Sequence, residues 1–157
     1  RRMGFQVAAV GRGADIAQDA LALGAHVYID ADHENPTARL QAMGGAQAVV
    51  ATVAKPEAVS GLLKALAPQG RLVVLAAGKD PLSVVTGPLV RGERAVIGSI
   101  TGSPYENEKT LAFSVLAGVR PWIETLPLER AEDAYRRMKS GNVKFRMVLT
   151  TAASTGG

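Results

Sequence analysis

The chain has no cysteine, few aromatic residues and no long apolar run. Its 157 residues include one tryptophan, three tyrosines and three phenylalanines. Without cysteine there is no disulfide framework and no zinc site built on thiolates. Glycine, proline or charge interrupts every apolar run before the roughly 18 to 20 residues that cross a bilayer, and no apolar stretch of a secretion signal follows Arg1 and Arg2. We expect a cytoplasmic protein without a membrane-spanning segment.

A nucleic-acid partner is not expected either, although the formal net charge is +4. The basic residues are scattered and do not alternate with aromatic ones, so the pattern of a base-stacking surface is missing. The one basic cluster lies late in the chain and comprises Arg130, Arg136, Arg137, Lys139, Lys144 and Arg146. A solvated helix face together with an anion site for a phosphorylated cofactor explains this cluster better.

Short apolar segments alternate with helix signals in the first half of the chain. Strands are predicted at residues 6–10, 27–29, 48–51 and 71–76. Of the helices between them, the first is ended by Gly24, the second is capped by Asn35 with Pro36 in its first turn, and the third is opened by Pro56. Strands that are apolar throughout, with helices between them, form a parallel sheet covered on both faces. The predicted fold class is α/β, a doubly wound parallel sheet forming one domain over residues 1–150.

The second half of the chain continues with shorter elements. The segment Leu82-Ser-Val-Val85 is predicted to be extended, and a helix should start at Pro104, inside a capping-box pattern, and run towards Gly118. Residues 88–91 should form a helical turn, residues 95–98 and 122–126 two strands, and residues 151–157 a disordered tail.

Residues 126–150 place an amphipathic helix, a glycine stop and a β-strand in immediate succession. This order resembles the closing unit of the medium-chain, zinc-type alcohol dehydrogenases, and the resemblance extends upstream through nearly the whole chain. It implies a Rossmann-like cofactor domain in which Arg146 contacts the pyrophosphate, with Lys144 able to assist. Arg146 is expected on a largely buried strand, where a charge needs an anionic ligand or, as the alternative, a carboxylate partner.

The turn Gly11-Arg-Gly13 follows the first predicted strand. In the family, the acidic residue that binds the ribose 2′-hydroxyl of NAD aligns with Gly11. The resemblance therefore implies that Gly11, Arg12 and Gly13 lie at the adenosine ribose, where Arg12 favours the 2′-phosphate of NADP over NAD. Without the resemblance, the pattern would indicate only a glycine turn with an arginine in solvent.

Small residues also follow later strands, at the edge where open α/β sheets bind ligands. The resemblance assigns to the nicotinamide half of the cofactor Thr52, Val53, Ala76, Ala77, Gly78, Ser99, Ile100 and Thr101. No catalytic residue or metal ligand is predicted, since neither His26 nor His33 has a partner at metal-ligand spacing. The zinc of the family would be held outside this chain.

The glycine-rich fingerprint of the family should precede the ribose position by about 20 residues, which is more than the sequence before Gly11 offers. We expect the sheet to be incomplete at its N-terminal unit, and the amino-terminal catalytic domain to be missing as well. In the strand order 3-2-1-4-5-6 the first strand is central, so strands 2 and 4 should have unpaired inner edges. Another polypeptide could supply the missing unit, the sheet could close up, or subunits could exchange pieces.

Three hypotheses for function follow. The first is the cofactor-binding portion of a zinc-type, NAD(P)-dependent alcohol dehydrogenase, which transfers a hydride between NADP(H) or NAD(H) and an alcohol or aldehyde. This chain alone would be inactive. The second is a non-catalytic nucleotide-binding or regulatory module, and the third is an interaction protein without a ligand.

We also expect a homodimer that forms through the segment from Leu82 to Val85, with Ala95 to Gly98 next to it. In dimeric members of the family, the matching short strand pairs with its own copy across a two-fold axis. The segment carries no charge that would protect an exposed edge against such pairing. An apolar loop that crosses the edge of the sheet is the alternative.

Overall fold

The computed structural model describes residues 1–151 of the chain. It divides the chain into two compact units: unit 1, Arg1–Ser103, and unit 2, which begins at Pro104. Thr151 follows the last strand without regular structure, and the rest of the predicted disordered tail, residues 152–157, lies outside the described residues. The prediction of one domain over residues 1–150 stays a prediction.

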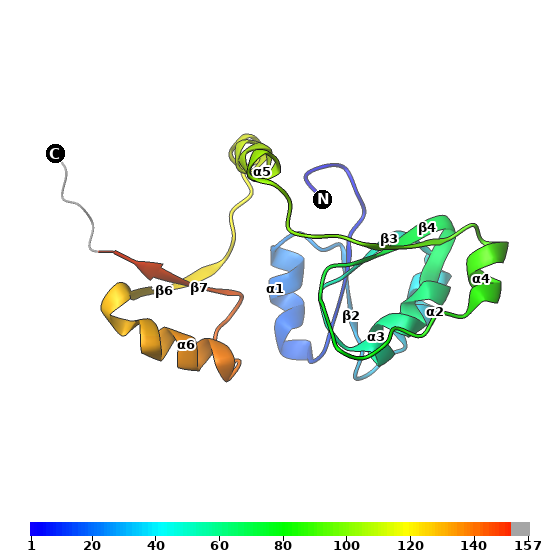
Figure 1. Ribbon diagram of the computed structural model, residues 1–157, viewed down its shortest axis with the longest axis horizontal. Helices are drawn as coiled ribbons and strands as arrows, with labels where there is room; N and C mark the ends of the chain where they lie inside the picture. Colours follow the sequence, from blue (N-terminus) through cyan, green and yellow to red (C-terminus); the bar gives the residue numbers. More distant parts are fainter. Residues whose placement is uncertain (152–157) are drawn as a thin grey trace. The chain divides into compact units, whose positions relative to one another are not determined.

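The first sheet of unit 1 consists of β1 (Ala8–Gly11) and β2 (Val27–Asp30), which pair in parallel (Figure 1). Their last residues, Gly11 and Asp30, stand opposite each other. The connection contains η1 (Ala14–Ile16) and α1 (Ala17–Ala22). Gly24 adopts φ +116°, a conformation that side chains disfavour, which confirms it as the end of this helical segment.

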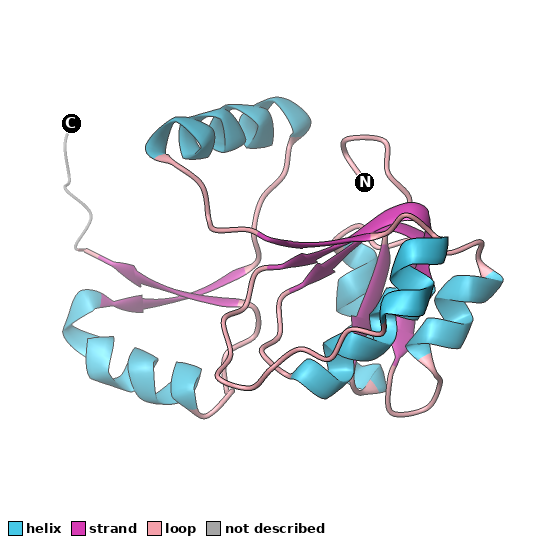
Figure 2. Cartoon of the chain, turned by 45° about the vertical axis from the view of Figure 1, so that its right-hand side comes forward, coloured by secondary structure: helices cyan, strands magenta, loops and turns pink. Residues whose placement is uncertain are grey.

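The second sheet contains β3 (Ala46–Ala51), β4 (Leu66–Val74) and β5 (Ala95–Gly98), all parallel. The preceding and connecting helices, shown in Figure 2, are α2 (Pro36–Ala42), α3 (Pro56–Ser60), η2 (Gly61–Ala65) and α4 (Thr86–Arg91). The predicted cap of α2 is confirmed, because Asn35 Oδ1 accepts a hydrogen bond of 3.1 Å from the N–H of Ala38.

The residues Pro68-Gln-Gly70, which by their types predict a turn before the strand at 71–76, lie inside β4 instead. The strand begins at Leu66, and its pairing with β3 shifts register between Ala46 and Ala48. Gln69 has φ 60°, and its N–H donates to the carbonyl of Gly92 rather than to the neighbouring strand. The turn-forming residues therefore produce a β-bulge, and β4 continues on both sides of it.

The two sheets of unit 1 are separate. Within the described residues, β1 is hydrogen-bonded only to β2, and β3 only to β4, so each has one unpaired edge. This confirms the unpaired edges predicted for the strands that would be numbers 2 and 4 of a complete sheet. The alternative in which the sheet closes up is wrong for this structure.

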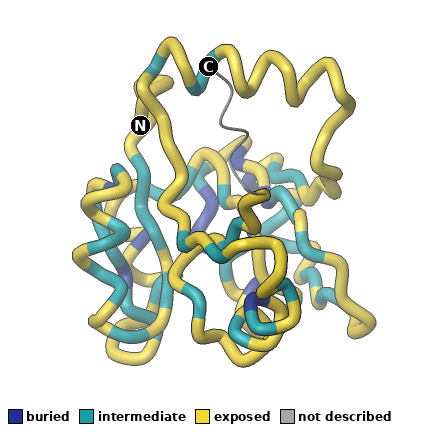
Figure 3. Tube along the Cα trace, turned by 90° about the vertical axis from the view of Figure 1, so that its left-hand side faces the viewer, coloured by how far each residue is buried: buried dark blue, intermediate teal, exposed yellow. Residues whose placement is uncertain are grey.

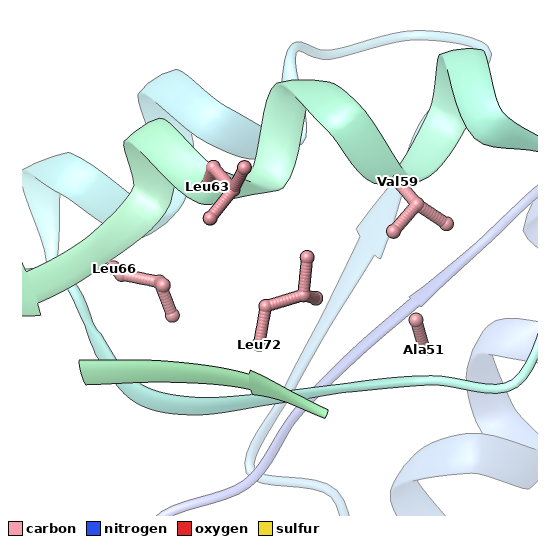
Figure 4. Close-up of a cluster of buried hydrophobic side chains, with 5 residues drawn as sticks. All are labelled: Ala51, Val59, Leu63, Leu66 and Leu72. Carbon is pink, nitrogen blue, oxygen red and sulfur yellow. The ribbon is translucent and has the colours of Figure 1, made fainter. Parts of the chain in front are cut away.

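The main core of unit 1 lies between the α3–η2 segment and the β3–β4 pair. Val59 and Leu63 point from the helical segment towards Leu72 and Ala51 of the strands, with Leu66 beside them (Figure 4). Leu72 is completely buried. A second cluster, Ile29, Leu40 and Ala65, joins β2 to α2 and η2. These clusters fix the ends of the strands relative to the helices that follow them.

Unit 2 contains fewer buried residues. Its elements are α5 (Pro104–Ala117), β6 (Ile123–Pro127), η3 (Leu128–Arg130), α6 (Ala131–Lys139) and β7 (Arg146–Thr150). Strands β6 and β7 pair in parallel, and Ala134 of α6 is buried. No residue of α5 is buried. Figure 3 shows that most of the described chain trace is exposed or intermediate and that few stretches are buried. Within residues 1–151, no helix is long and apolar enough to cross a membrane.

The segment from Leu82 to Val85 forms no strand in the described chain. Leu82 and Val84 pack against the main core, whereas Val85 is 60% exposed. This alternation fits an extended segment that lies on the core with one face. The helical turn predicted after it is confirmed and somewhat longer, as α4.

Candidate functional site

The strands of unit 1 end in register, which gathers the predicted site residues of this unit at two strand-end edges. Gly11 and Asp30 end the first sheet together. In the second sheet, Ala51 stands opposite Val74, and Val74 opposite Gly98. The backbone pairing continues for one residue beyond these ends, since Leu75 N–H donates to the Ala51 carbonyl and Ser99 N–H to the Val74 carbonyl, both at 3.0 Å. Carboxyl ends of parallel strands are the usual ligand-binding edge of such sheets.

The Gly11–Gly13 turn has no room for a side chain at its first position. A Cβ added to Gly11 would lie 2.7 Å from the Tyr28 hydroxyl and 2.8 Å from Cδ1 of Ile16. Gly13 adopts φ +88°, which disfavours any other residue there. An acidic side chain of the kind that aligns with position 11 in the family would have to displace Tyr28 and Ile16.

Side chains at the end of β2 hold this turn in place. The Tyr28 hydroxyl donates a hydrogen bond of 2.8 Å to the Gly13 carbonyl, and Gly13 N–H donates one of 3.1 Å to Asp30 Oδ1. Asp32 N–H donates to the same oxygen at 3.0 Å, and His33 Nδ1 lies 2.9 Å from Asp30 Oδ2. The Asp30 carboxylate therefore links the Gly11–Gly13 turn to the loop after β2.

These contacts also set the protonation of the cluster. The N–H of Asp32, followed by the His33 ring and the Gly13 N–H, lowers the pKa of the Asp30 carboxyl below its usual value. Burial raises the pKa of the Tyr28 hydroxyl, and the nearby carboxylates of Asp30, Asp15 and Asp32 add to the effect. At neutral pH the carboxylate at Asp30 accepts hydrogen bonds and the Tyr28 phenol donates one.

Arg12 is the cation that this turn presents. Its guanidinium Nε lies 3.8 Å from Asp32 Oδ1, and the two side chains are 67% and 48% exposed. An exposed pair at this distance contributes little stability, about 0 to 1 kcal/mol. Arg12 can therefore turn towards an anionic ligand at small cost.

The second edge contains a small cavity of about 120 Å³ at the ends of β3 and β4. Three predicted residues line it, Val53, Ala76 and Gly78, and Leu82 lines it as well. A Cβ added to Gly78 would lie 3.4 Å from the Ala54 carbonyl oxygen, an ordinary van der Waals contact. Thr52, Ala77 and the predicted residues after β5, which are Ser99, Ile100 and Thr101, are exposed near the same strand ends.

Several residues of this cavity and of the Gly11–Gly13 turn were not predicted from the sequence. The cavity is also lined by Lys55, Pro56 and Asp80, and Tyr28 and Asp30 hold the turn by hydrogen bonds to Gly13. One signal was available for Asp30, because it ends the strand after β1 and the ends of neighbouring parallel strands share one edge. Nothing in the spacing of the other residues indicated their positions.

Arg146 lies in unit 2, at the start of β7, and it is exposed. The expectation of a largely buried strand is wrong, because β7 pairs only with β6 in the described chain and most of its residues stay accessible. None of the ion pairs within residues 1–151 involves Arg146, so a carboxylate partner is not what the structure shows.

The backbone before Arg146 has an unusual conformation. Phe145 has φ 69°, and Arg146 N–H donates to the Lys144 carbonyl at 3.1 Å, a tight three-residue turn. Glu124 anchors it by accepting a 2.6 Å hydrogen bond from Lys144 N–H and another from Arg137. These two donors, the Lys144 N–H first, lower the pKa of the Glu124 carboxyl. The Phe145 and Trp122 rings form a T-shaped pair with centroids 5.4 Å apart.

The described residues do not suit a metal ion. Within residues 1–151, no group of three or more His, Cys, Asp or Glu side chains is arranged to hold one. Asp30 and His33 touch each other, but no third ligand joins them.

Comparison with known proteins identifies the family. Residues 1–116 match the family described as zinc-binding dehydrogenase. The chain belongs to this family. Alcohol dehydrogenase patD of Penicillium expansum is 35% identical over 149 residues, which cover 95% of this chain and 44% of that protein. Aldehyde reductase AdhA of Synechocystis sp. is 30% identical over 150 residues, covering 96% and 44%.

Solved structures agree on the fold. A cinnamyl alcohol dehydrogenase from Sorghum bicolor matches with a TM-score of 0.79 and 25% identity over 93% of this chain and 41% of that one. A benzyl alcohol dehydrogenase from Acinetobacter calcoaceticus matches with a TM-score of 0.83 and 19% identity, over 94% and 43%. The chain spans less than half the length of these relatives and corresponds to their cofactor-binding part. The predicted α/β, Rossmann-like fold and the family are confirmed.

Proposed function

We propose that this chain is the cofactor-binding portion of a zinc-type alcohol dehydrogenase that prefers NADP(H) to NAD(H) and interconverts an alcohol and an aldehyde. The observation that carries the proposal is the set of in-register strand ends in unit 1: Ala76 and Gly78 help to line a cavity at the second sheet, and Arg12 supplies a cation at the first. Membership of the zinc-binding dehydrogenase family supports it.

The residues present fit a dinucleotide in the way that the family resemblance implies. Gly11, Arg12 and Gly13 would hold the adenosine ribose, with the guanidinium on a 2′-phosphate. The strand ends at residues 52–53, 76–78 and 99–101 would receive the nicotinamide half, which supplies the hydride chemistry when bound. Arg146 would bind the pyrophosphate, a role that rests on the resemblance together with its exposed side chain, which forms no ion pair within residues 1–151.

The described residues do not fit the zinc site of such an enzyme, since no ligand set is present among them. A catalytic zinc in the full-length enzyme would need ligands from other parts of that protein. The residues of this chain bind and orient the cofactor, and we assign none of them to proton transfer or to metal binding.

Hydrogen–deuterium exchange with and without NADP tests where the cofactor binds. We expect slower exchange at Gly11–Gly13, at residues 52–54 and at residues 76–78, because bound ligand covers these backbone N–H groups. The α5 helix, which has no buried residue, provides an internal control that should not change. Protection confined to α5 or α6, or no protection at saturating NADP, would contradict the proposed site.

We also propose that the chain forms a homodimer through Leu82 to Val85 beside β5. Two features support this: Val85 is 60% exposed, and the outer edge of β5 has no partner strand within the described residues. An unprotected edge next to an extended apolar segment favours pairing with a second copy.

Sedimentation of Val85→Lys tests the dimer. We expect the wild type to sediment as a dimer at micromolar concentration and the variant to dissociate at least tenfold more readily, because the two lysines would repel each other near the axis. Val84 is unsuitable for this test because it packs on the core. Val90→Lys, at a 74% exposed position on α4, is the matched control. A monomeric wild type, or equal dimers in all three proteins, would refute this interface.

A further inference from the structure

We propose that Asp32 sets the selectivity of the Gly11–Gly13 turn for a phosphorylated ribose, because its carboxylate competes with the 2′-phosphate for the Arg12 guanidinium. The inference rests on the proposed placement of the adenosine ribose at this turn. It adds a specificity-determining residue that the glycine pattern of the turn does not indicate.

One oxygen atom links the backbone beside Arg12 to that of Asp32. Asp30 Oδ1 accepts the N–H of Gly13, the residue after Arg12, and also the N–H of Asp32 itself. The backbones that carry Arg12 and Asp32 are thus tied to the same carboxylate. The 3.8 Å contact between their side chains follows from that arrangement, although these side chains are 67% and 48% exposed.

The charges around the turn make this competition significant. Three carboxylates, Asp15, Asp30 and Asp32, are close enough to the Tyr28 hydroxyl to act on it, whereas Arg12 is the cation that the turn itself carries. Asp30 is engaged by three donors and remains fixed. Asp32 faces Arg12 directly, so a 2′-phosphate that pairs with Arg12 must displace the Asp32 carboxylate and then lie near it.

Titration of the chain with adenosine 2′,5′-bisphosphate and with 5′-AMP isolates this effect, because the two probes differ only in the 2′-phosphate. We expect Asp32→Asn to lower the Kd for the bisphosphate about two- to fivefold, the range of an exposed ion pair. The Kd for 5′-AMP should stay within about twofold, and the gain should shrink as salt is added.

Asp15→Asn is the matched control. It removes the same charge beside Gly13, where its Oδ1 would lie 2.5 Å from an added Cβ, but Asp15 forms no ion pair with Arg12 in the described chain. A larger gain for Asp32→Asn than for Asp15→Asn supports direct competition. If the wild type binds both probes, equal gains in affinity for the two variants, or no gain in either, overturn direct competition by Asp32. If the wild type binds neither probe, the proposed cofactor site fails and this inference falls with it.

Discussion

Replacing Arg12 by alanine should reduce the affinity of the chain for NADP about 10- to 100-fold and leave its affinity for NAD nearly unchanged. A charge-assisted hydrogen bond to a phosphate contributes about 1.5 to 3 kcal/mol, which corresponds to that range. The present partner of Arg12 is the exposed Asp32, and little stability is lost with that contact. Calorimetric titration of both cofactors into wild type and variant measures the change.

Arg39→Ala controls for the loss of a positive charge as such. Arg39 pairs with Glu34 at the same 3.8 Å, with 48% and 41% of the side chains exposed, so its setting resembles that of Arg12. It lies on α2 and is not one of the predicted cofactor-binding residues. We expect the NADP-to-NAD ratio of this variant to equal that of the wild type. If Arg12→Ala also kept the wild-type ratio, the selector for the phosphate would lie elsewhere.

Leu72→Ala should destabilise unit 1 by about 2 to 5 kcal/mol, because it opens a cavity in a packed core. Leu72 is completely buried between α3–η2 and the strands and contacts the side chains that hold the ends of β3 and β4 in place (Figure 4). Urea unfolding followed by circular dichroism measures the loss. A domain that lacks a continuous sheet has little stability in reserve, so we also expect weaker cofactor binding.

Leu75→Ala is the comparison for Leu72→Ala. Leu75 follows β4 directly and is 45% exposed, so the same truncation should cost less than about 1 kcal/mol there. Equal losses for the two variants would show that the core lies elsewhere.

Local signals predicted most elements of this fold. Residues that begin or end helices affect only the backbone within a few positions of themselves. The structure has helix boundaries next to the ones named from the sequence, which are Asn35 with Pro36, Pro56 and Gly24. Continuous apolar runs predicted parallel strands, which the pairing confirms. The position of the ligand-binding edge follows from strand direction, so Gly11, Val53 and Gly78 could be proposed from the sequence.

Contacts between distant segments could not be predicted in this way. The Tyr28 and Asp30 side chains form hydrogen bonds with Gly13, which is 15 and 17 residues away in the sequence, and no spacing rule predicts such contacts. The bulge at Gln69 depends on the neighbouring strand, although the turn residues there suggested a break. The exposure of Arg146 depends on how few elements cover β7, a property of packing rather than of the strand's own residues.

Titration of the wild-type chain with NADP and with NAD at low salt tests whether this chain binds the cofactor and prefers its phosphorylated form. We expect saturable binding of both, with NADP bound more tightly and losing that advantage as salt screens Arg12. Saturable binding of neither cofactor, or tighter binding of NAD at every salt concentration, would contradict this expectation.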